Sequence, residues 1–247
     1  MSAPQPTILA TSGGWRWGPR GRDWAPLAHH AVALARVPVG RRPRVCFLGT
    51  AVGDQLSAAA DVYAAGHRAG FETSVLDLFP MPSVDDVRAH LLAQDVVWVN
   101  GGSVVNLLAV WRAHHLEDAL HAAWQAGVVL AGVSAGSICW YQGGPTDSYG
   151  PVLRPVTDAL GFLPYGNGVH YDNEAQRRPL LHDMVADGTL GESHCTDDGV
   201  GMVYAGTELV EAVAETPGKG AYVVRRDESG SGVTETRIEP RLLPGSR

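Results

Sequence analysis

A serine flanked by small residues follows a short apolar run near the middle of the chain. Residues 128–133 are apolar, and Ser134 comes next within the pattern Gly-x-Ser-x-Gly of residues 132–136. A serine on a sharp turn between a strand and a helix is exposed at the end of the strand, and its neighbours must be small to avoid clashes. The pattern therefore predicts a nucleophilic Ser134, with the N–H of Ala135 in the first turn of the helix as an oxyanion donor.

The same pattern has a purely structural interpretation, in which Ser134 caps a glycine-rich helix and accepts a backbone hydrogen bond. Gly-x-Ser-x-Gly also occurs by chance, but the preceding apolar strand and the small neighbours favour the nucleophile. A serine hydroxyl reacts only when a nearby base takes its proton, and histidine suits this role at neutral pH. The chain has ten histidines, so the pattern alone does not select the base.

Short apolar runs alternate with longer Ala- and Leu-rich stretches on both sides of Ser134. This alternation is typical of a parallel sheet with helices on both faces. Strands are expected at 7–11, 43–49, 72–78, 95–100 and 128–133. Helices are expected at 24–37, 54–69, 84–93 and 103–126, the last with Leu107, Val110 and Trp111 on one buried face.

The last part of the chain changes to short strands, which we expect to add an antiparallel edge to the sheet. They are expected at 200–206, 208–214, 220–226 and 233–239, with a turn at 227–232. Residues 13–23 and 142–169 are expected to be long or glycine- and proline-rich loops, which often carry function. For Trp15 and Trp17 in the first loop, a surface clasp and a substrate-lining role both remain open.

Composition restricts the class of protein. With 247 residues, 45% hydrophobic and 18% charged, the chain is expected to form one domain, 1–247. A net charge of −7 argues against nucleic-acid and anionic-membrane partners, which need a basic surface. The N-terminus resembles no signal peptide and no stretch is long enough to span a bilayer, so a cytoplasmic location is expected. Three cysteines give no disulfide framework or zinc spacing, and we expect neither metal nor cofactor.

Five segments in one order carry a further signal. They are residues 100–108 (NGGSVVNLL), 132–140 (GVSAGSICW), 145–148 (PTDS), 168–172 (GVHYD) and 196–199 (TDDG). Together they resemble the peptidase E family of serine peptidases, which contains aspartyl dipeptidases and has cyanophycinases as relatives. The resemblance runs from about residue 7 to 215. It implies an α/β fold, a three-layer α/β/α sandwich with a mostly parallel sheet, like that of class I glutamine amidotransferases.

The resemblance also implies a catalytic triad. Ser134 would be the nucleophile, His170 the general base and Asp198 the acid that orients the imidazole. Asp197 and Asp198 both precede Gly199, and the choice of Asp198 rests on register with the family's acid-Gly pair. Hydrolysis would pass through an acyl-enzyme on Ser134, with no metal.

The substrate implied by the resemblance is a short peptide, in particular a dipeptide with an N-terminal aspartyl residue. Gly101 or Gly102 would supply a second oxyanion N–H. Asp147 would contact the substrate amino group or serve only as a turn residue. Arg177 or Arg178 would bind the acidic side chain or lie on a solvated helix surface.

Two departures from the family leave the second oxyanion donor and the substrate pocket open. Asn100 stands where glycine is common, and residues 183–193 form a shorter stretch. The oligomeric state, including a homo-oligomer, also stays open.

Two other functions compete with this one. An α/β-hydrolase esterase orders its triad as serine, acid and histidine, so Asp147 or Asp158 would be the acid and His194 the base. A non-catalytic amidotransferase-like binding module would keep the fold and leave Ser134 without a role.

Overall fold

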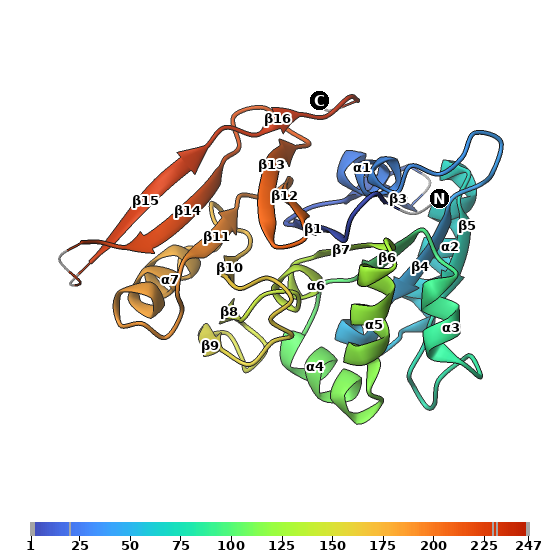
Figure 1. The fold of residues 1–247 in the computed structure, drawn as a ribbon, viewed down its shortest axis with the longest axis horizontal. Coiled ribbons are helices and arrows are strands. Elements are labelled where there is room, and N and C mark those ends of the chain that lie inside the picture. The colour runs from blue at the N-terminus through green and yellow to red at the C-terminus, as the bar shows by residue number, and fades with distance from the viewer. Residues whose placement is uncertain (1–2, 20, 229, 231, 246–247) are drawn as a thin grey trace.

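A central eight-stranded sheet dominates the computed structural model, which describes residues 3–19, 21–228, 230 and 232–245 (Figure 1). Its order is β16-β13-β12-β1-β7-β6-β4-β5. The strands are β1 (Thr7–Thr11), β4 (Arg44–Leu48), β5 (Glu72–Val75), β6 (Val96–Val99), β7 (Val129–Val133), β12 (Val200–Ala205), β13 (Glu208–Ala214) and β16 (Arg241–Leu242). The five strands from β1 to β5 in this order run parallel, which confirms the predicted mostly parallel α/β fold.

A second sheet of four strands lies beside the first, in the order β10-β11-β14-β15. Its strands are β10 (Gly166–Gly168), β11 (Ser193–Thr196), β14 (Ala221–Arg226) and β15 (Val233–Ile238). The expectation that all C-terminal strands extend the central sheet is therefore right for β12 and β13 and wrong for β14 and β15. β14 pairs with β11 instead. Of the turn expected at 227–232, Ser229 and Ser231 lie outside the described residues, as do Met1 and Ser2.

Two short hairpins occupy the segments expected to be loops. β2 (Trp15–Gly18) pairs with β3 (Gly21–Trp24), and β8 (Gly144–Thr146) pairs with β9 (Arg154–Val156). The first hairpin packs against the sheet through Trp15 and Trp24, whose rings meet that of Trp98 on β6. Neither hairpin has the alternation of a long strand, so the sequence pattern did not reveal them.

The helices are α1 (Pro26–Leu34), α2 (Leu56–Ala69), α3 (Val87–Leu92), α4 (Val104–Ala113), α5 (Leu116–Gln125), α6 (Ala135–Ile138) and α7 (Arg177–Ala186), with a 3₁₀ turn η1 (Thr50–Val52). The single helix expected at 103–126 is two helices. His115 between them has a left-handed φ of 52°, which no α-helix continues through. Helix α7 has no strong apolar stripe, and the sequence indicated a helix there only through the alternative that Arg177 and Arg178 lie on a solvated helix surface.

The helices form two layers around the central sheet. Leu27 of α1 and Val62 of α2 pack with Trp98 on one face. Leu107 of α4 and Leu120 of α5 belong to the core on the other face, together with residues of α3 and α6. Helix α7 packs against the second sheet instead, beside β14 in Figure 1. No helix in the described part of the chain is both long and apolar enough to cross a lipid bilayer.

This arrangement brings three strand ends together. β6, β7 and β1 are neighbours and parallel, so their carboxyl ends meet at one edge of the sheet, where ligands bind in open α/β folds. The residues just beyond these ends are Asn100, Ser134 and Ser12.

Replacing Leu120 with Ala is expected to lower the free energy of unfolding by about 2–5 kcal/mol, because its side chain is fully buried between α5 and the sheet. Leu56→Ala is the control, since Leu56 is 84% exposed, and its effect should stay within about 0.5 kcal/mol. Urea denaturation measures both. Equal losses in the two variants would contradict this location of the core.

Candidate active site

Ser134 occupies a sharp turn between β7 and α6. Its φ of 58° and ψ of −116° are rare for a residue with a side chain, and such backbone strain typically costs about 1–3 kcal/mol. The Ser134 N–H donates to Thr11 at 3.0 Å, and its carbonyl accepts from Ser137 and Ile138 at 2.8 and 2.9 Å. Its hydroxyl makes no capping hydrogen bond to α6. The serine is therefore held by its backbone, and its side chain remains available.

The glycines on either side of Ser134 are required by close packing. A Cβ on Gly132 would meet the carbonyl of Gly136, and a Cβ on Gly136 would meet the carbonyl of Val99 on the neighbouring strand β6. The turn can therefore sit close to β6 only with glycine at both positions. This is the steric reason behind the Gly-x-Ser-x-Gly pattern in this chain.

Two backbone segments with N–H groups flank Ser134. Ala135 is the first residue of α6, where a helix leaves its N–H without an internal partner. Gly101 lies on the other side, since a Cβ built on it would be 3.1 Å from the Ser134 Cβ and 3.7 Å from its hydroxyl. Gly102 follows with a φ of 139°, and a Cβ on it would meet the carbonyl of Ala51. Ala135 and Gly101 thus border the serine directly.

His170 is fixed to the same strand end as Ser134. Its backbone N–H donates to the hydroxyl of Ser12 at 3.0 Å, whereas Ser134 is bound to the adjacent Thr11. The Ser12 hydroxyl lies 2.7 Å from that of Thr196 and 3.1 Å from its carbonyl. Two consecutive residues at the end of β1 therefore anchor the serine and the histidine, which places them at the same edge of the central sheet.

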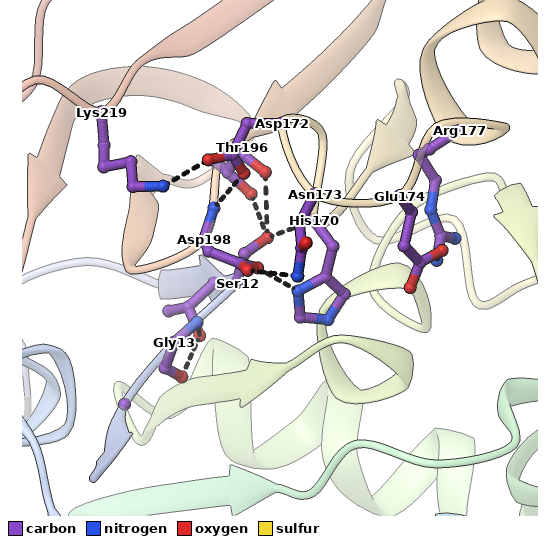
Figure 2. Close-up of polar contacts among 12 residues, drawn as sticks. Ser12, Gly13, His170, Asp172, Asn173, Glu174, Arg177, Thr196, Asp198 and Lys219 are labelled. Carbon is purple, nitrogen blue, oxygen red and sulfur yellow. Dashed lines mark hydrogen bonds and ion pairs between the residues drawn. The ribbon is translucent and has the colours of Figure 1, made fainter.

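Asp198 lies behind the imidazole of His170. One carboxylate oxygen is 2.5 Å from His170 Nδ1, and the other accepts from Asn173 at 3.0 Å (Figure 2). The Asp198 N–H donates to Asp172 at 2.9 Å. The side chains of His170 and Asp198 are 23% and 35% exposed. The pair is thus oriented by several contacts and still reachable from solvent.

The second sheet explains why His170 and Asp198 meet. Strands β10 and β11 are parallel, with Gly168 opposite Cys195. His170 follows the end of β10 and Asp198 follows the end of β11. Because parallel strands end at the same edge, the two side chains leave that edge together.

Asp172 and Asp197 take supporting places around this pair. Burial alone would raise the pKa of Asp172, but hydrogen bonds from Lys219 and from the Asp198 N–H bring that pKa below its ordinary value. Asp197 points the other way and accepts from the Gly220 N–H at 2.7 Å and from Tyr222 at 3.2 Å. Burial raises the pKa of Asp197. Of the two neighbouring aspartates, only Asp198 contacts His170.

Asp147 is exposed on the loop after β8, beside the start of α4. Its neighbour Ser148 accepts a hydrogen bond from Val104 at 2.9 Å, so this loop lies next to the segment of Gly101 and Gly102. Asp147 shares a pocket with Glu174, which the sequence did not single out. The other residues of that pocket are Pro151, Leu153, Ala175 and Gln176.

The two arginines expected to bind an acidic side chain have other contacts. Arg177 is 2% exposed, and its guanidinium donates to Glu174 and to the Pro145 carbonyl. Arg178 lies over the ring of Tyr171, with its Cζ 4.4 Å from the ring centre, and is 3.6 Å from Glu235. Arg177 is therefore buried beneath the pocket, and Arg178 faces the second sheet.

His194 lies in the interior of the second sheet. It is 2% exposed, with Nδ1 2.6 Å from the Tyr204 hydroxyl and Nε2 2.9 Å from Glu192. Asp158, an acid in the esterase interpretation, pairs with Arg112 at 3.0 Å. The structure thus brings neither Asp147 nor Asp158 into contact with His194 among the residues it describes.

Sequence reasoning missed three residues that shape the site: Ser12, Asn173 and Glu174. Ser12 directly follows an apolar strand, and this position is the one signal that pointed to it. Asn173 and Glu174 lie close to the histidine segment, but no sequence pattern singles them out. Over the described ranges, no group of three or more His, Cys, Asp or Glu side chains is placed to hold a metal ion.

Comparisons with known proteins find a family and a relative that match most of this chain. The model of peptidase family S51 matches residues 22–211. An uncharacterized peptidase, YgaJ, from Bacillus subtilis (strain 168) is 38% identical over 187 residues, covering 76% of this chain and 80% of that protein.

Two solved structures share the fold. A peptidase from an acI-B1 Actinobacterium has a TM-score of 0.69 at 15% identity, covering 97% of this chain and 96% of that one. A putative peptidase E protein from Listeria monocytogenes EGD-e has a TM-score of 0.57 at 16% identity, covering 83% and 97%. At these identities the likeness concerns the fold.

The buried His194 predicts a pH dependence of stability. Burial lowers the pKa of its ring below the ordinary value of 6.5, with Glu192 opposing the shift. As the pH falls, the unfolded chain therefore binds this proton before the folded protein does. The contribution of neutral His194 to the free energy of unfolding is complete above pH 6.5 and is lost as the pH falls toward the folded-state pKa. Between about pH 7 and 5, wild type should lose unfolding free energy more steeply than His194→Gln.

Chemical denaturation across this pH range is the measurement. His67→Gln is the matched control, because His67 is exposed on α2 and should keep the wild-type slope. A His194→Gln slope identical to that of wild type would contradict the prediction.

Proposed function

This chain belongs to peptidase family S51 and is a serine-type peptidase, and we propose that it hydrolyses short peptides through a triad of Ser134, His170 and Asp198. One observation carries the triad: Thr11 and Ser12 hold the backbones of Ser134 and His170, and Asp198 lies 2.5 Å from the His170 ring. The strained backbone of Ser134 and its uncapped side chain support the same role.

In the proposed reaction, His170 donates its Nδ1 proton to Asp198 in a hydrogen bond, which leaves the Nε2 lone pair for the proton of Ser134. The Ser134 oxygen attacks the carbonyl carbon of the peptide bond. Protonated His170 then gives its proton to the leaving amine, and an acyl ester remains on Ser134. A water molecule deprotonated by His170 hydrolyses this ester and restores the enzyme.

The tetrahedral intermediates carry a negative oxygen that must be stabilised. We assign this to the N–H of Ala135, which benefits from its place at the start of α6, and to Gly101 or Gly102 across the site. Gly101 is the better placed, because a Cβ built on it would lie 3.1 Å from the Ser134 Cβ, whereas one on Gly102 would meet Ala51. One such donor is typically worth about 10²–10³ in rate.

The proposed substrates are dipeptides with an N-terminal aspartyl residue. Asp147 and Glu174 line one pocket, and two carboxylates suit the charged amino group of a short peptide. Arg177 binds Glu174 from beneath and so positions this pocket. A peptide longer at its N-terminus would lack the charge at this point, which favours removal of single N-terminal residues.

Ser134→Ala is expected to abolish both hydrolysis and labelling by a fluorophosphonate. The variant lacks the activated hydroxyl, and the other serines, which are not activated, do not react with this reagent. His170→Ala should lose both in the same way, and His194→Gln should keep them. Asp-Xaa, Glu-Xaa and neutral dipeptides and simple esters serve as substrates, with Asp-Xaa expected to be the best.

The same variants separate the competing functions. Activity that needs His194 and survives without His170 would point to the esterase order of residues. Folded wild-type protein that neither binds the probe nor cleaves any substrate would point to a binding module.

Asp198→Asn is expected to reduce kcat by up to about 10⁴-fold while the fold is retained, because an amide at this place favours the wrong tautomer of His170. Asp197→Asn is the matched control, since Asp197 contacts Gly220 and Tyr222 instead, and it should stay within a few-fold of wild type. Steady-state kinetics on the best dipeptide measures both. Equal losses would remove Asp198 from the triad.

A further inference from the structure

The β2–β3 hairpin is fixed rigidly over the central sheet. Trp15 and Trp24 stack with ring centres 3.7 Å apart, and both meet the edge of Trp98, which belongs to β6. Gly14 at the start of the hairpin has a φ of 108°, and a Cβ there would strike the Trp98 ring. The hairpin thus rests on the same strand that ends at Asn100.

Helix α2 holds the hairpin from the other side. Arg68 donates to the Asp23 carboxylate at 2.5 Å and to the Arg22 carbonyl at 2.7 Å. Glu215 accepts from the Gly14 and Leu27 N–H groups at 3.4 and 2.8 Å. Residues on this hairpin therefore have fixed positions, as a binding group needs.

Arg22 extends from this hairpin to Asn100, the residue that follows β6. Its guanidinium carbon lies 4.0 Å from the centre of the Trp15 ring, and Nη2 is 3.4 Å from the side-chain oxygen of Asn100. The residue after Asn100 is Gly101, on which a Cβ would lie 3.1 Å from the Ser134 Cβ. One side chain and one residue thus separate the guanidinium from the serine.

The guanidinium of Arg22 has few partners. A guanidinium carries five N–H donors, and the contact with Asn100 is its one hydrogen bond within the described residues, where it forms no ion pair. Burial lowers the pKa of Arg22, and Asp61 opposes this through its charge at longer range. A partly buried cation without a close counterion is costly unless a ligand supplies the negative charge.

We propose that Arg22 binds a carboxylate of the peptide substrate and thereby determines substrate specificity. This proposal rests on the proposed function, because it takes Ser134 as the reacting group. Arg177 and Arg178 are already occupied by Glu174, Tyr171 and Glu235. In the part of the chain that the structure describes, the Arg22 guanidinium has one hydrogen bond, to Asn100, and so keeps N–H donors for a carboxylate.

Two carboxylates of a dipeptide could fill this place: the side chain of an N-terminal aspartate or the C-terminus. Asp-Leu-amide keeps only the first and Asn-Leu only the second, so the two substrates distinguish them. Asn-Leu-amide carries neither and reports on chemistry alone.

The variants are Arg22→Gln, Arg22→Lys and Arg16→Gln. Arg16 is opposite Asp23 and Arg22 is opposite Trp17 in the hairpin, so the two arginines lie on opposite faces. Arg22→Gln should lower kcat/KM about 10- to 100-fold for the substrates with the recognised carboxylate and leave Asn-Leu-amide unchanged. Arg22→Lys should fall between, and Arg16→Gln should match wild type.

A binding measurement makes the test independent of catalysis. In the Ser134→Ala background, calorimetry should detect Asp-Leu, and adding Arg22→Gln should weaken binding at least about tenfold. Unchanged binding of Asp-Leu, or an equal loss of activity on Asp-Leu-amide, Asn-Leu and Asn-Leu-amide, would overturn the role of Arg22. A different result would contradict the proposed function itself, namely hydrolysis that survives in the Ser134→Ala variant.

Discussion

Two hydrogen bonds at the end of β1 hold the site together. The Thr11 carbonyl accepts from Ser134, and the Ser12 hydroxyl accepts from His170. The first bond lies within the central sheet, between the ends of β7 and β1. The second joins the end of β1 to the loop after β10 of the second sheet. Because Ser12 also contacts Thr196 on β11, a single small side chain fixes the spacing between the two sheets where the proposed chemistry takes place.

Each sheet contributes a different part of the proposed triad. The central sheet supplies the nucleophile, because β7 must turn sharply into α6 beside β6. The second sheet supplies the base and the acid, because β10 and β11 are parallel and end side by side. Lys219 and Asp172 then form a charged support for Asp198. The imidazole is thereby oriented from the sheet that does not carry the serine.

The tryptophan-rich hairpin adds a third contribution from outside both sheets. The sequence left a surface clasp and a substrate-lining role open for Trp15 and Trp17. In the structure, Trp15 is half-buried and packs against Trp24 and Trp98, whereas Trp17 is 78% exposed. Trp15 also supports the guanidinium of Arg22 from below. A stacked aromatic platform of this kind holds a long, flexible side chain in one place at low entropic cost.

The sequence by itself determined the parallel strands and the turn at Ser134, because apolar periodicity and small residues act over a few neighbouring positions. His170 and Asp198 were predicted through a resemblance, since no local pattern separates one histidine from nine others. Only the tertiary structure decided the second sheet, the break at His115, the burial of Arg177 and the contact of Arg22 with Asn100. Those features depend on contacts between segments far apart in the chain, and a linear pattern does not encode which distant groups will meet.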